Sequence, residues 1–302
     1  MAKIAIVGVG AIGGVTAALL QQAGHELLLC TRRSMSGLVV ETPDGAVNID
    51  ATMVTRPADA FDVDWVFVAT KAYDVAGTAV WLERLCSKGA PVAVLQNGVE
   101  HRERFAPYVV KEKILPVMVD CPAERQAPDR VRQRGVMHLK VPEGVMGRDF
   151  VELFAGTPAD ATVVPDFLSV VWRKLCFNSA GVLSALLMQP AGVVREEALG
   201  EVALEIIREC AAVARAEGAY LEEDVANVVL AAQRAAPADS INSMLADRQA
   251  GRPVEIDARN AVIVRFGRKH GIATPANSMA VALMGVMVHS ESGQRGAQSW
   301  PL

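Results

Sequence analysis

A glycine pattern close to the N-terminus has the spacing needed to hold phosphate groups. Gly8, Gly10 and Gly13, with Ala11 and Ile12 between the last two, match GxGxxG. The first glycine permits a tight turn, the second lets a pyrophosphate approach the backbone, and the third lets a helix pack closely on a strand. The helix that follows would supply N–H donors and the positive end of its dipole. The pattern predicts a dinucleotide-binding site, the alternative being a tight turn without a ligand.

The residues after the second predicted strand indicate which dinucleotide is bound. NAD- and FAD-binding proteins carry an acidic residue about 20 residues after the glycines, where it holds the ribose hydroxyls. Here the strand 26–31 ends in Arg32 and Arg33, with no acidic residue. A carboxylate would repel a 2′-phosphate, whereas a guanidinium pairs with it through charge-assisted bonds of about 1.5–3 kcal/mol. We therefore expect NADP(H) rather than NAD(H), unless both arginines are simply solvated.

Polar residues also follow two further predicted strands at their C-terminal ends. Lys71 follows the strand 65–69, and Asn97 follows the strand 92–96. Ligands of an open α/β sheet lie outside the carboxyl ends of its strands. Both residues are candidates for ligand contact, although a surface lysine and a turn asparagine are expected in any such fold.

The C-terminal half contains a lysine and an asparagine one helical turn apart. Lys174 and Asn178 share one helix face and border the apolar positions Val171 and Leu175. A lysine beside apolar surface can have its pKa lowered and act as a general acid. The alternative is a lysine that forms a salt bridge or extends its stem over apolar surface.

Three more polar residues in this half are not diagnostic by themselves. Glu255 and Asp257 follow Pro253 in the first turn of a predicted helix, where acids complement the helix dipole. Ser243 lies in a short stretch, 240–245, that is also predicted to be helical.

The elements that must position these residues fall into two classes along the chain. Residues 3–119 alternate short apolar runs with helical stretches, which is typical of a parallel sheet with crossover helices. After about residue 165 the apolar positions follow a helical stripe instead. The sequence predicts an N-terminal Rossmann-type, doubly wound α/β domain that binds NADP(H), 1–167, and an all-α substrate and catalytic domain, 168–302. The predicted strands are 3–7, 26–31, 65–69, 92–96 and 114–119, with a hairpin over 38–49 and an edge strand over 131–139. Helices are predicted over 11–23, 256–270 and 275–289, and apolar stripes over 168–175 and 202–213 indicate two more, the second of which is a long helix that ends near Gly218.

Composition excludes several classes of function. The 302 residues carry a net charge of −4, which disfavours nucleic-acid binding. Charged or amide residues interrupt every apolar run of about 18 residues, so we expect no membrane span, and the opening residues lack a signal-peptide pattern. The five cysteines are scattered without CxxC spacing, and the five histidines form no metal-ligand pattern. A cytoplasmic protein without a metal is expected.

Taken together and in order, these motifs resemble the ketopantoate reductase (2-dehydropantoate 2-reductase) family over essentially the whole chain. The resemblance implies a two-domain fold and reduction of a 2-oxo acid by NADPH in the cleft between the domains, with 2-dehydropantoate, reduced to pantoate in pantothenate biosynthesis, as the first candidate substrate. The motifs are GVGAIGG at 8–14, Arg32, Thr70-Lys71-Ala72, Gln96-Asn97-Gly98, Trp172-Arg173-Lys174-Leu175 with Asn178, Ser243-Met244-Leu245, and Glu255-Ile256-Asp257 with Asn260.

The resemblance also implies a role for each matching residue. Lys174 would protonate the carbonyl oxygen, and Glu255 would hold the substrate hydroxyl and orient the lysine. Asn97, Asn178 and Ser243 would contact the substrate. The implied cofactor contacts are Gly8, Gly10, Ala11, Ile12, Gly13, Arg32, Lys71 and Asn97.

The chain departs from the family pattern at Val182, where members carry a second asparagine four residues after the one that matches Asn178. Loss of a hydrogen bond to a substrate hydroxyl changes substrate choice, so another branched 2-oxo acid is an alternative substrate. A non-catalytic NADP(H) sensor is a second alternative, although retention of Lys174 and Glu255 speaks against it. A hydroxyacid or nucleotide-sugar dehydrogenase is a third, but such enzymes prefer NAD and an acid at position 32. The helical domain would also allow a homodimer.

Overall fold

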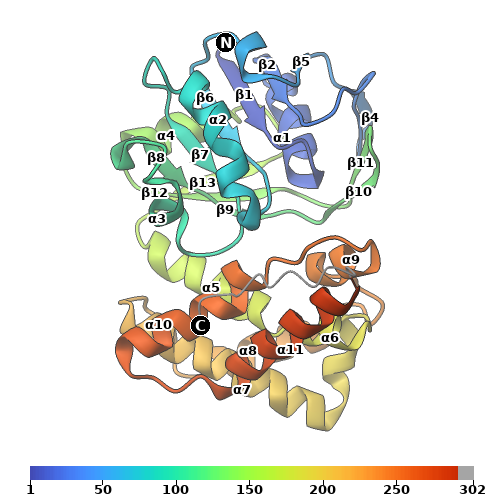
Figure 1. The fold of residues 1–302 in the computed structure, drawn as a ribbon, viewed down its shortest axis with the longest axis vertical. Helices are drawn as coiled ribbons and strands as arrows, with labels where there is room; N and C mark the ends of the chain where they lie inside the picture. Colours follow the sequence, from blue (N-terminus) through green and yellow to red (C-terminus); the bar gives the residue numbers. More distant parts are fainter. Residues whose placement is uncertain (292–302) are drawn as a thin grey trace. The chain divides into compact units, whose positions relative to one another are not determined.

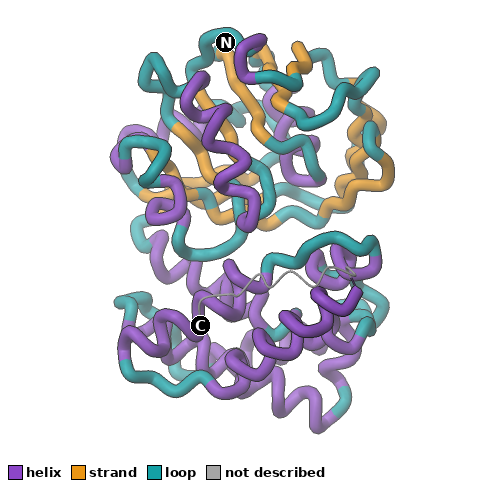
Figure 2. The backbone as a smooth tube through the Cα atoms, in the orientation of Figure 1, coloured by secondary structure: helices purple, strands orange, loops and turns teal. Residues whose placement is uncertain are grey.

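The computed structural model describes residues 1–291 of the chain, with side chains described to residue 287. The chain divides into two compact units, Met1–Phe167 and the residues from Leu168 onward. The first unit mixes strands and helices, whereas the regular elements described in the second are helices (Figures 1 and 2). The predicted fold class, an α/β unit followed by an all-α unit, is therefore confirmed.

A six-stranded parallel sheet forms the centre of the first unit. Its strands are β1 (Lys3–Val7), β2 (Glu26–Cys30), β5 (Thr52–Val54), β6 (Trp65–Val68), β7 (Val92–Val94) and β8 (Ile114–Pro116). They stand in the order β5-β2-β1-β6-β7-β8, and each neighbouring pair is parallel. From β1 the chain builds first toward one edge and then, from β6, toward the other. The strand order therefore reverses between β1 and β6, where ligands of such sheets bind.

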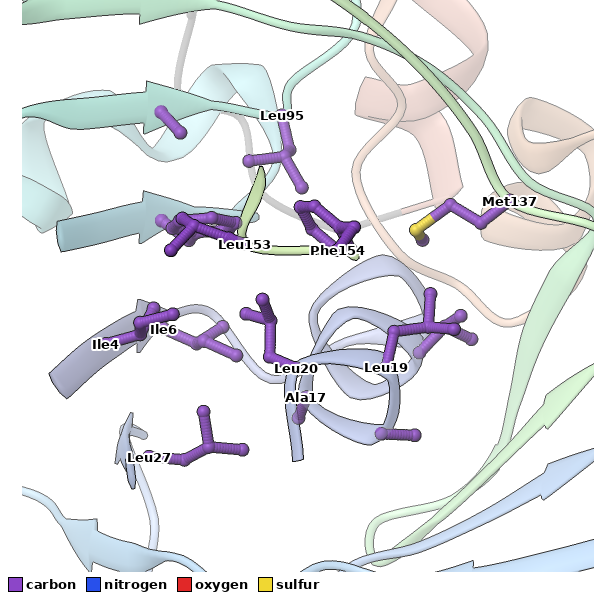
Figure 3. Close-up of a cluster of buried hydrophobic side chains, with 14 of the residues drawn as sticks. Ile4, Ile6, Ala17, Leu19, Leu20, Leu27, Leu95, Met137, Leu153 and Phe154 are labelled. Carbon is purple, nitrogen blue, oxygen red and sulfur yellow. The ribbon is translucent and has the colours of Figure 1, made fainter. Parts of the chain in front are cut away.

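Helices cover both faces of this sheet, which explains why its strands are almost continuously apolar. These helices are α1 (Ala11–Gln22), α2 (Val75–Leu85), α3 (His101–Phe105) and α4 (Val145–Glu152). Ile4 and Ile6 of β1 pack with α1 and α4, and Figure 3 shows both beside Leu20 in this layer. Ala5 and Val7 point to the opposite face and pack with α2 and α3. The alternation of side chains along one strand thus supplies two separate core layers.

Two smaller sheets belong to the same unit. The predicted hairpin over 38–49 is confirmed, since β3 (Val39–Thr42) and β4 (Gly45–Asn48) pair antiparallel. The predicted strand 114–119 is divided: β8 ends at Pro116, and β9 (Met118–Asp120) joins a second sheet, β13-β12-β9. This sheet also contains β12 (His138–Pro142) and β13 (Asp160–Val164).

The single edge strand predicted over 131–139 is wrong. The segment contains β11 (Arg130–Gln133) and β12, and β11 is an inner strand of the sheet β10-β11-β3-β4, with β10 spanning Ala123–Ala127. Val131 is buried while Arg130 and Arg132 are exposed, and this alternation is the same in an edge strand and an inner strand. The distinction depends on β3, which is distant in sequence and whose Glu41 accepts a hydrogen bond from Arg130 at 2.8 Å.

The second unit is a cluster of helices with a buried polar network. The helices are α5 (Phe167–Ser179), α6 (Val182–Leu187), α7 (Glu197–Ala216), α8 (Val225–Ala235), α9 (Ser243–Gln249), α10 (Val262–His270) and α11 (Pro275–Glu291). The Asn260 amide donates to the Ser179 carbonyl at 3.0 Å and to Asn277 Oδ1 at 2.9 Å. Asn277 in turn donates to the carboxylate of Glu209, which also accepts bonds from the first backbone N–H groups of α11. This network fixes α5, α7 and α11 around residue 260.

The helix predicted over 256–270 contains a π-helical turn at its start. Residues Asp257–Ala261 adopt the π conformation, and α10 continues from Val262. Turns of this kind are rare and frequently occur at functional sites.

One helical stretch, Phe167–Leu187, has the length and hydropathy of a membrane-spanning segment. It comprises α5, α6 and the turn between them, and 56% of its most apolar 18-residue window is buried inside the protein. Core helices of globular proteins meet the same criteria, so this stretch is weak support for a membrane role.

Candidate active site

The three glycines after β1 occupy the positions that a phosphate cradle requires. Gly8 has φ +97°, and a Cβ there would lie 2.7 Å from the backbone nitrogen of Thr70. A Cβ on Gly13 would lie 2.1 Å from the Gly8 carbonyl oxygen, so α1 approaches β1 as closely as its backbone allows. A Cβ on Gly10 would meet nothing within 4 Å. The backbone at Gly10 is therefore open to a ligand, while the other two glycines close the turn.

Helix α1 begins directly at this opening. Gly10 is its N-cap residue and has no side chain to cap the first turn, which contains no acidic residue. The first N–H groups of a helix have no carbonyl partner within it. Ala11 and Ile12, both half-buried, carry such groups at the cradle. The arrangement fits an anion such as a pyrophosphate.

Arg32 lies on the adjacent strand end, after β2. Its side chain is 83% exposed, and its Nη2 atom lies 3.3 Å from Asp74 Oδ2. Surface pairs of this kind contribute about 0–1 kcal/mol, so Asp74 leaves the guanidinium available to a phosphate. The sequence analysis missed Asp74, because this acid reaches Arg32 from a segment 42 positions later.

The loops after β6 and β7 are tied together by a glutamine. The Gln96 side-chain amide donates to Thr70 Oγ1 at 2.9 Å and to the Lys71 carbonyl at 3.2 Å. The Gln96 carbonyl accepts a hydrogen bond from His101 Nε2 at 2.8 Å, and burial lowers the pKa of His101, favouring its neutral form. Lys71 and Asn97, both half-buried, are thereby held at the carboxyl edge of the sheet.

In the second unit, α5 carries the predicted lysine. Lys174 and Asn178 are half-buried and one turn apart, whereas Val171 and Leu175 beside them are buried. The neighbouring Arg173 pairs with Glu222.

Ser243 and Asn178 are brought into one region by a residue that the sequence analysis did not single out. Asn242 caps α9, because its Oδ1 accepts a hydrogen bond from the Leu245 N–H at 3.0 Å. The Asn242 amide also donates to the Gly181 carbonyl at 3.0 Å, in the turn that follows α5. Ser243, the first residue of α9, is thus fixed beside the turn that begins at Asn178.

Glu255 precedes the π-helical turn by two residues and is buried. It therefore lies just before its helix, whereas the sequence analysis placed it in the first turn. Four residues later, the guanidinium of Arg259 is also buried and donates from Nη2 to Ser243 Oγ at 3.2 Å. Burial lowers the pKa of Arg259, and the negative charges of Glu255 and Asp247 act in the opposite direction. The structure thus brings Ser243 and the segment of Glu255 together through Arg259.

Comparison with known families decides which proteins share this arrangement. The family described as Ketopantoate reductase PanE/ApbA matches residues 4–145, and its C-terminal family, Ketopantoate reductase PanE/ApbA C terminal, matches residues 166–288. The chain belongs to the ketopantoate reductase family. The family resemblance and the enzyme class predicted from the motifs are therefore confirmed, and the chain is an oxidoreductase with a nucleotide-binding fold.

Individual relatives of the family align over nearly the whole chain. The 2-dehydropantoate 2-reductase of Caulobacter vibrioides is 47% identical over 285 residues, which are 94% of this chain and 98% of that protein. The solved PanE/ApbA family ketopantoate reductase of Ralstonia eutropha JMP134 has a TM-score of 0.87 and 31% identity, over 96% of this chain and 99% of the other. A ternary structure of D-mandelate dehydrogenase with NADH and anilino(oxo)acetate has the same TM-score, 0.87, at 23% identity, over 96% and 99% of the two chains. This last similarity concerns the fold alone.

Val182, the departure from the family pattern, lies in the core of the second unit. It is the first residue of α6 and is fully buried. A branched apolar side chain suits this position, and valine has no side-chain donor or acceptor to offer a substrate hydroxyl.

Metal-ligating and thiol groups are dispersed in the described part of the chain. No group of three or more His, Cys, Asp and Glu side chains there is placed to hold a metal ion. The five cysteines are free, and burial raises the pKa of Cys30 to about 12. Buried thiols of this kind are chemically inert.

Proposed function

We propose that this chain reduces 2-dehydropantoate to pantoate with NADPH. The observation that carries the proposal is the 47% identity, over nearly the full length of both proteins, to a 2-dehydropantoate 2-reductase. The chain also retains Lys174, Asn97, Asn178, Ser243 and Glu255, although Val182 replaces the second asparagine of the family pattern.

The first unit would bind the cofactor. The fit rests on the open backbone at Gly10 and on the uncapped start of α1, which would take the pyrophosphate. Arg32 would pair with the 2′-phosphate, and its high exposure supports a preference for NADP(H) over NAD(H). Bound NADPH supplies a hydride for the substrate carbonyl carbon. The residues assigned to the cofactor are Gly8, Gly10, Ala11, Ile12, Gly13, Arg32, Lys71 and Asn97.

Lys174 would donate the proton that the reduction requires. Negative charge builds on the carbonyl oxygen as its carbon is reduced, and a positioned ammonium neutralises this charge by electrostatic attraction and proton transfer. The neutral amine then regains a proton from solvent. The Glu255 carboxylate would accept a hydrogen bond from the substrate hydroxyl and orient the ammonium. Asn97, Asn178 and Ser243 would hold the substrate.

The test measures NADPH oxidation at 340 nm with 2-dehydropantoate and with a panel of branched 2-oxo acids. We expect turnover with 2-dehydropantoate, and Lys174→Ala to lower it by about 10²–10⁴, the usual contribution of a positioned acid. NADPH affinity should stay unchanged in this variant. Arg173→Ala is the matched control: it removes the adjacent cation, which pairs with Glu222, and should leave turnover intact.

Three outcomes would contradict parts of the proposal. Tight NADPH binding without consumption in the presence of any 2-oxo acid would indicate a sensor rather than a reductase. Faster turnover of another branched 2-oxo acid would favour the second candidate substrate, which the apolar, buried Val182 makes reasonable. Equal turnover of Lys174→Ala and the wild type would remove the lysine from the mechanism.

We also propose that the chain assembles as a homodimer. Residues 275–287 of α11 contain no charged residue, although part of this helix faces solvent in the described structure. Met279, Leu283 and Val286 are exposed at helical spacing, Val286 to 71%. Contiguous exposed apolar surface of this kind marks interaction sites.

A further inference from the structure

The guanidinium of Arg259 is a buried positive charge with unused hydrogen-bond donors. The residue is only 4% exposed. Its Nη2 atom donates to Ser243 Oγ, but Nε and Nη1 have no hydrogen-bond partner among the described residues. Arginine stays protonated in proteins, so this group carries its charge in the folded state.

Such a group is costly unless something completes its hydrogen bonds. Buried polar groups in native proteins are nearly always paired, and an unpaired buried ionic donor is the most unfavourable case. Glu255 and Asp247 act on Arg259 electrostatically, and Asp247 also accepts a hydrogen bond from Arg252 at 2.9 Å. Neither carboxylate accepts a hydrogen bond from Nε or Nη1 of Arg259. A ligand with its own acceptor atoms would complete these bonds.

The position of the guanidinium fits a ligand site. Ser243 Oγ, which accepts the hydrogen bond from Nη2, belongs to an exposed residue, so the buried charge lies next to a residue that reaches solvent. Arg259 is the third residue of the π-helical turn. The next residue, Asn260, is anchored to Ser179 and Asn277, which holds the turn firmly in the core. Arg259 thus combines three features: it lies in a π-helical turn, its neighbour Asn260 is anchored, and two of its donor atoms have no partner among the described residues.

We propose that Arg259 binds the carboxylate of the 2-oxo acid substrate beside Ser243 and makes the site selective for acids over neutral analogues. This inference rests on the proposed function, because every 2-oxo acid carries this carboxylate. Nη2 has two N–H groups, so it can bond Ser243 and still donate to a carboxylate. Nη1 is itself buried, so a paired bond that includes Nη1 requires the side chain to shift toward Ser243. A planar guanidinium matches a carboxylate through such paired bonds, which a lysine cannot form. Glu255 and Asp247 oppose any anion here, so these short bonds must supply the selectivity.

The experiment compares pantoate with its primary amide, which has nearly the same shape and no charge. Binding of each to the NADP⁺-loaded enzyme is measured by titration calorimetry, together with KM and kcat for 2-dehydropantoate. We expect the wild type to bind the acid about 100-fold more tightly, the discrimination that paired ionic hydrogen bonds provide. Arg259→Met should abolish this preference and raise KM by about the same factor, with NADP⁺ affinity unchanged. Arg259→Lys should restore only part of the preference.

Controls separate the binding role from a structural one. Arg268→Met, an exposed arginine on α10, should leave both affinities unchanged. Equal binding of acid and amide by the wild type would overturn the inference, even if Arg259→Met fails to fold. Equal weakening of both ligands in Arg259→Met would also overturn it and assign the residue to the fold.

The inference and the proposed function can fail separately. A wild type that oxidises NADPH with 2-dehydropantoate but does not distinguish acid from amide retains the function and loses the carboxylate site. A wild type without reductase activity that still prefers the acid, in a manner that depends on Arg259, loses the proposed function and retains the site.

Discussion

Two arginines of this reductase place positive charge in contrasting environments. Arg32 is exposed, with Asp74 at 3.3 Å, whereas Arg259 is buried and its Nε and Nη1 atoms have no hydrogen-bond partner among the described residues. An exposed guanidinium attracts a phosphate that remains partly in water, and screening limits its contribution. The charge of a buried guanidinium is not screened by solvent, but it binds only a group that displaces water from its surroundings. The same side chain would therefore favour affinity for the cofactor at one position and selectivity among substrates at the other.

At the residue scale, Arg32→Asp should erase the preference for NADPH over NADH. The introduced carboxylate would repel a 2′-phosphate and accept hydrogen bonds from ribose hydroxyls. We expect the ratio of kcat/KM for NADPH over NADH to fall by at least about tenfold, the lower end of a charge-assisted hydrogen bond. Steady-state kinetics with both cofactors measure this ratio. Arg33→Ala, at the neighbouring exposed arginine, is the control, and an unchanged ratio in Arg32→Asp would show that the phosphate is bound elsewhere.

At the scale of elements, two glycines at the junction of β1 and α1 are needed for different reasons. Gly13 is required by packing, since a Cβ there would lie 2.1 Å from the Gly8 carbonyl. Gly10 has open space around it and a negative φ of −92°, so alanine is sterically acceptable in the protein alone. Only a ligand against the backbone would make the absence of a side chain at Gly10 necessary.

Substitution of these two glycines should therefore give opposite results. Gly10→Ala should leave the free energy of unfolding nearly unchanged and weaken NADPH binding by about tenfold or more, about 1.4 kcal/mol. Gly13→Ala should destabilise the fold by about 1–3 kcal/mol, as overpacked substitutions do. Chemical denaturation and fluorescence titration with NADPH measure the two quantities. Unchanged NADPH affinity in Gly10→Ala would contradict the cradle.

The loop after β7 should make stability depend on pH through His101. Burial lowers the pKa of His101 in the folded protein, so the unfolded chain takes up this proton first. The stability contributed by neutral His101 is complete above about pH 6.5 and is lost as the pH falls toward the lowered folded pKa, by at most about 1.4 kcal/mol per pH unit.

His101→Gln provides the comparison, because an amide can still donate to the Gln96 carbonyl but does not titrate in this range. The free energy of unfolding, measured at pH 7 and pH 5, should fall less in the variant than in the wild type. An equal fall in both proteins would mean that the pKa of His101 does not differ between the folded and unfolded chain, which would contradict the prediction.

At the scale of the whole molecule, the order of motifs along the chain was enough to predict the family and fold class. Fully buried parallel strands such as β1 and β6 are continuous apolar runs, and a sequence displays them directly. Pairings between strands that are distant in sequence could not be predicted. β11 was predicted at an edge because no residue near it in the sequence indicates that β3 lies beside it. The π-helical turn and the burial of Arg259 were missed for the same reason, since an arginine in a helix resembles a surface residue until its neighbours are known.

Assembly belongs to this scale as well, and α11 provides its test. Met279, Leu283 and Val286 would be buried against a second copy. Their burial would stabilise the dimer, because each Å² of apolar surface removed from water contributes about 25 cal/mol. We expect a dimer at micromolar concentration by size-exclusion chromatography with light scattering. The double substitution Leu283→Glu and Val286→Glu should give a monomer with an unchanged circular dichroism spectrum.

The matched control is Val228→Glu, at an exposed position on α8, which should leave the dimer intact. A wild type that elutes as a monomer would rule out this use of α11, and a dimer that survives the double substitution would place the interface elsewhere.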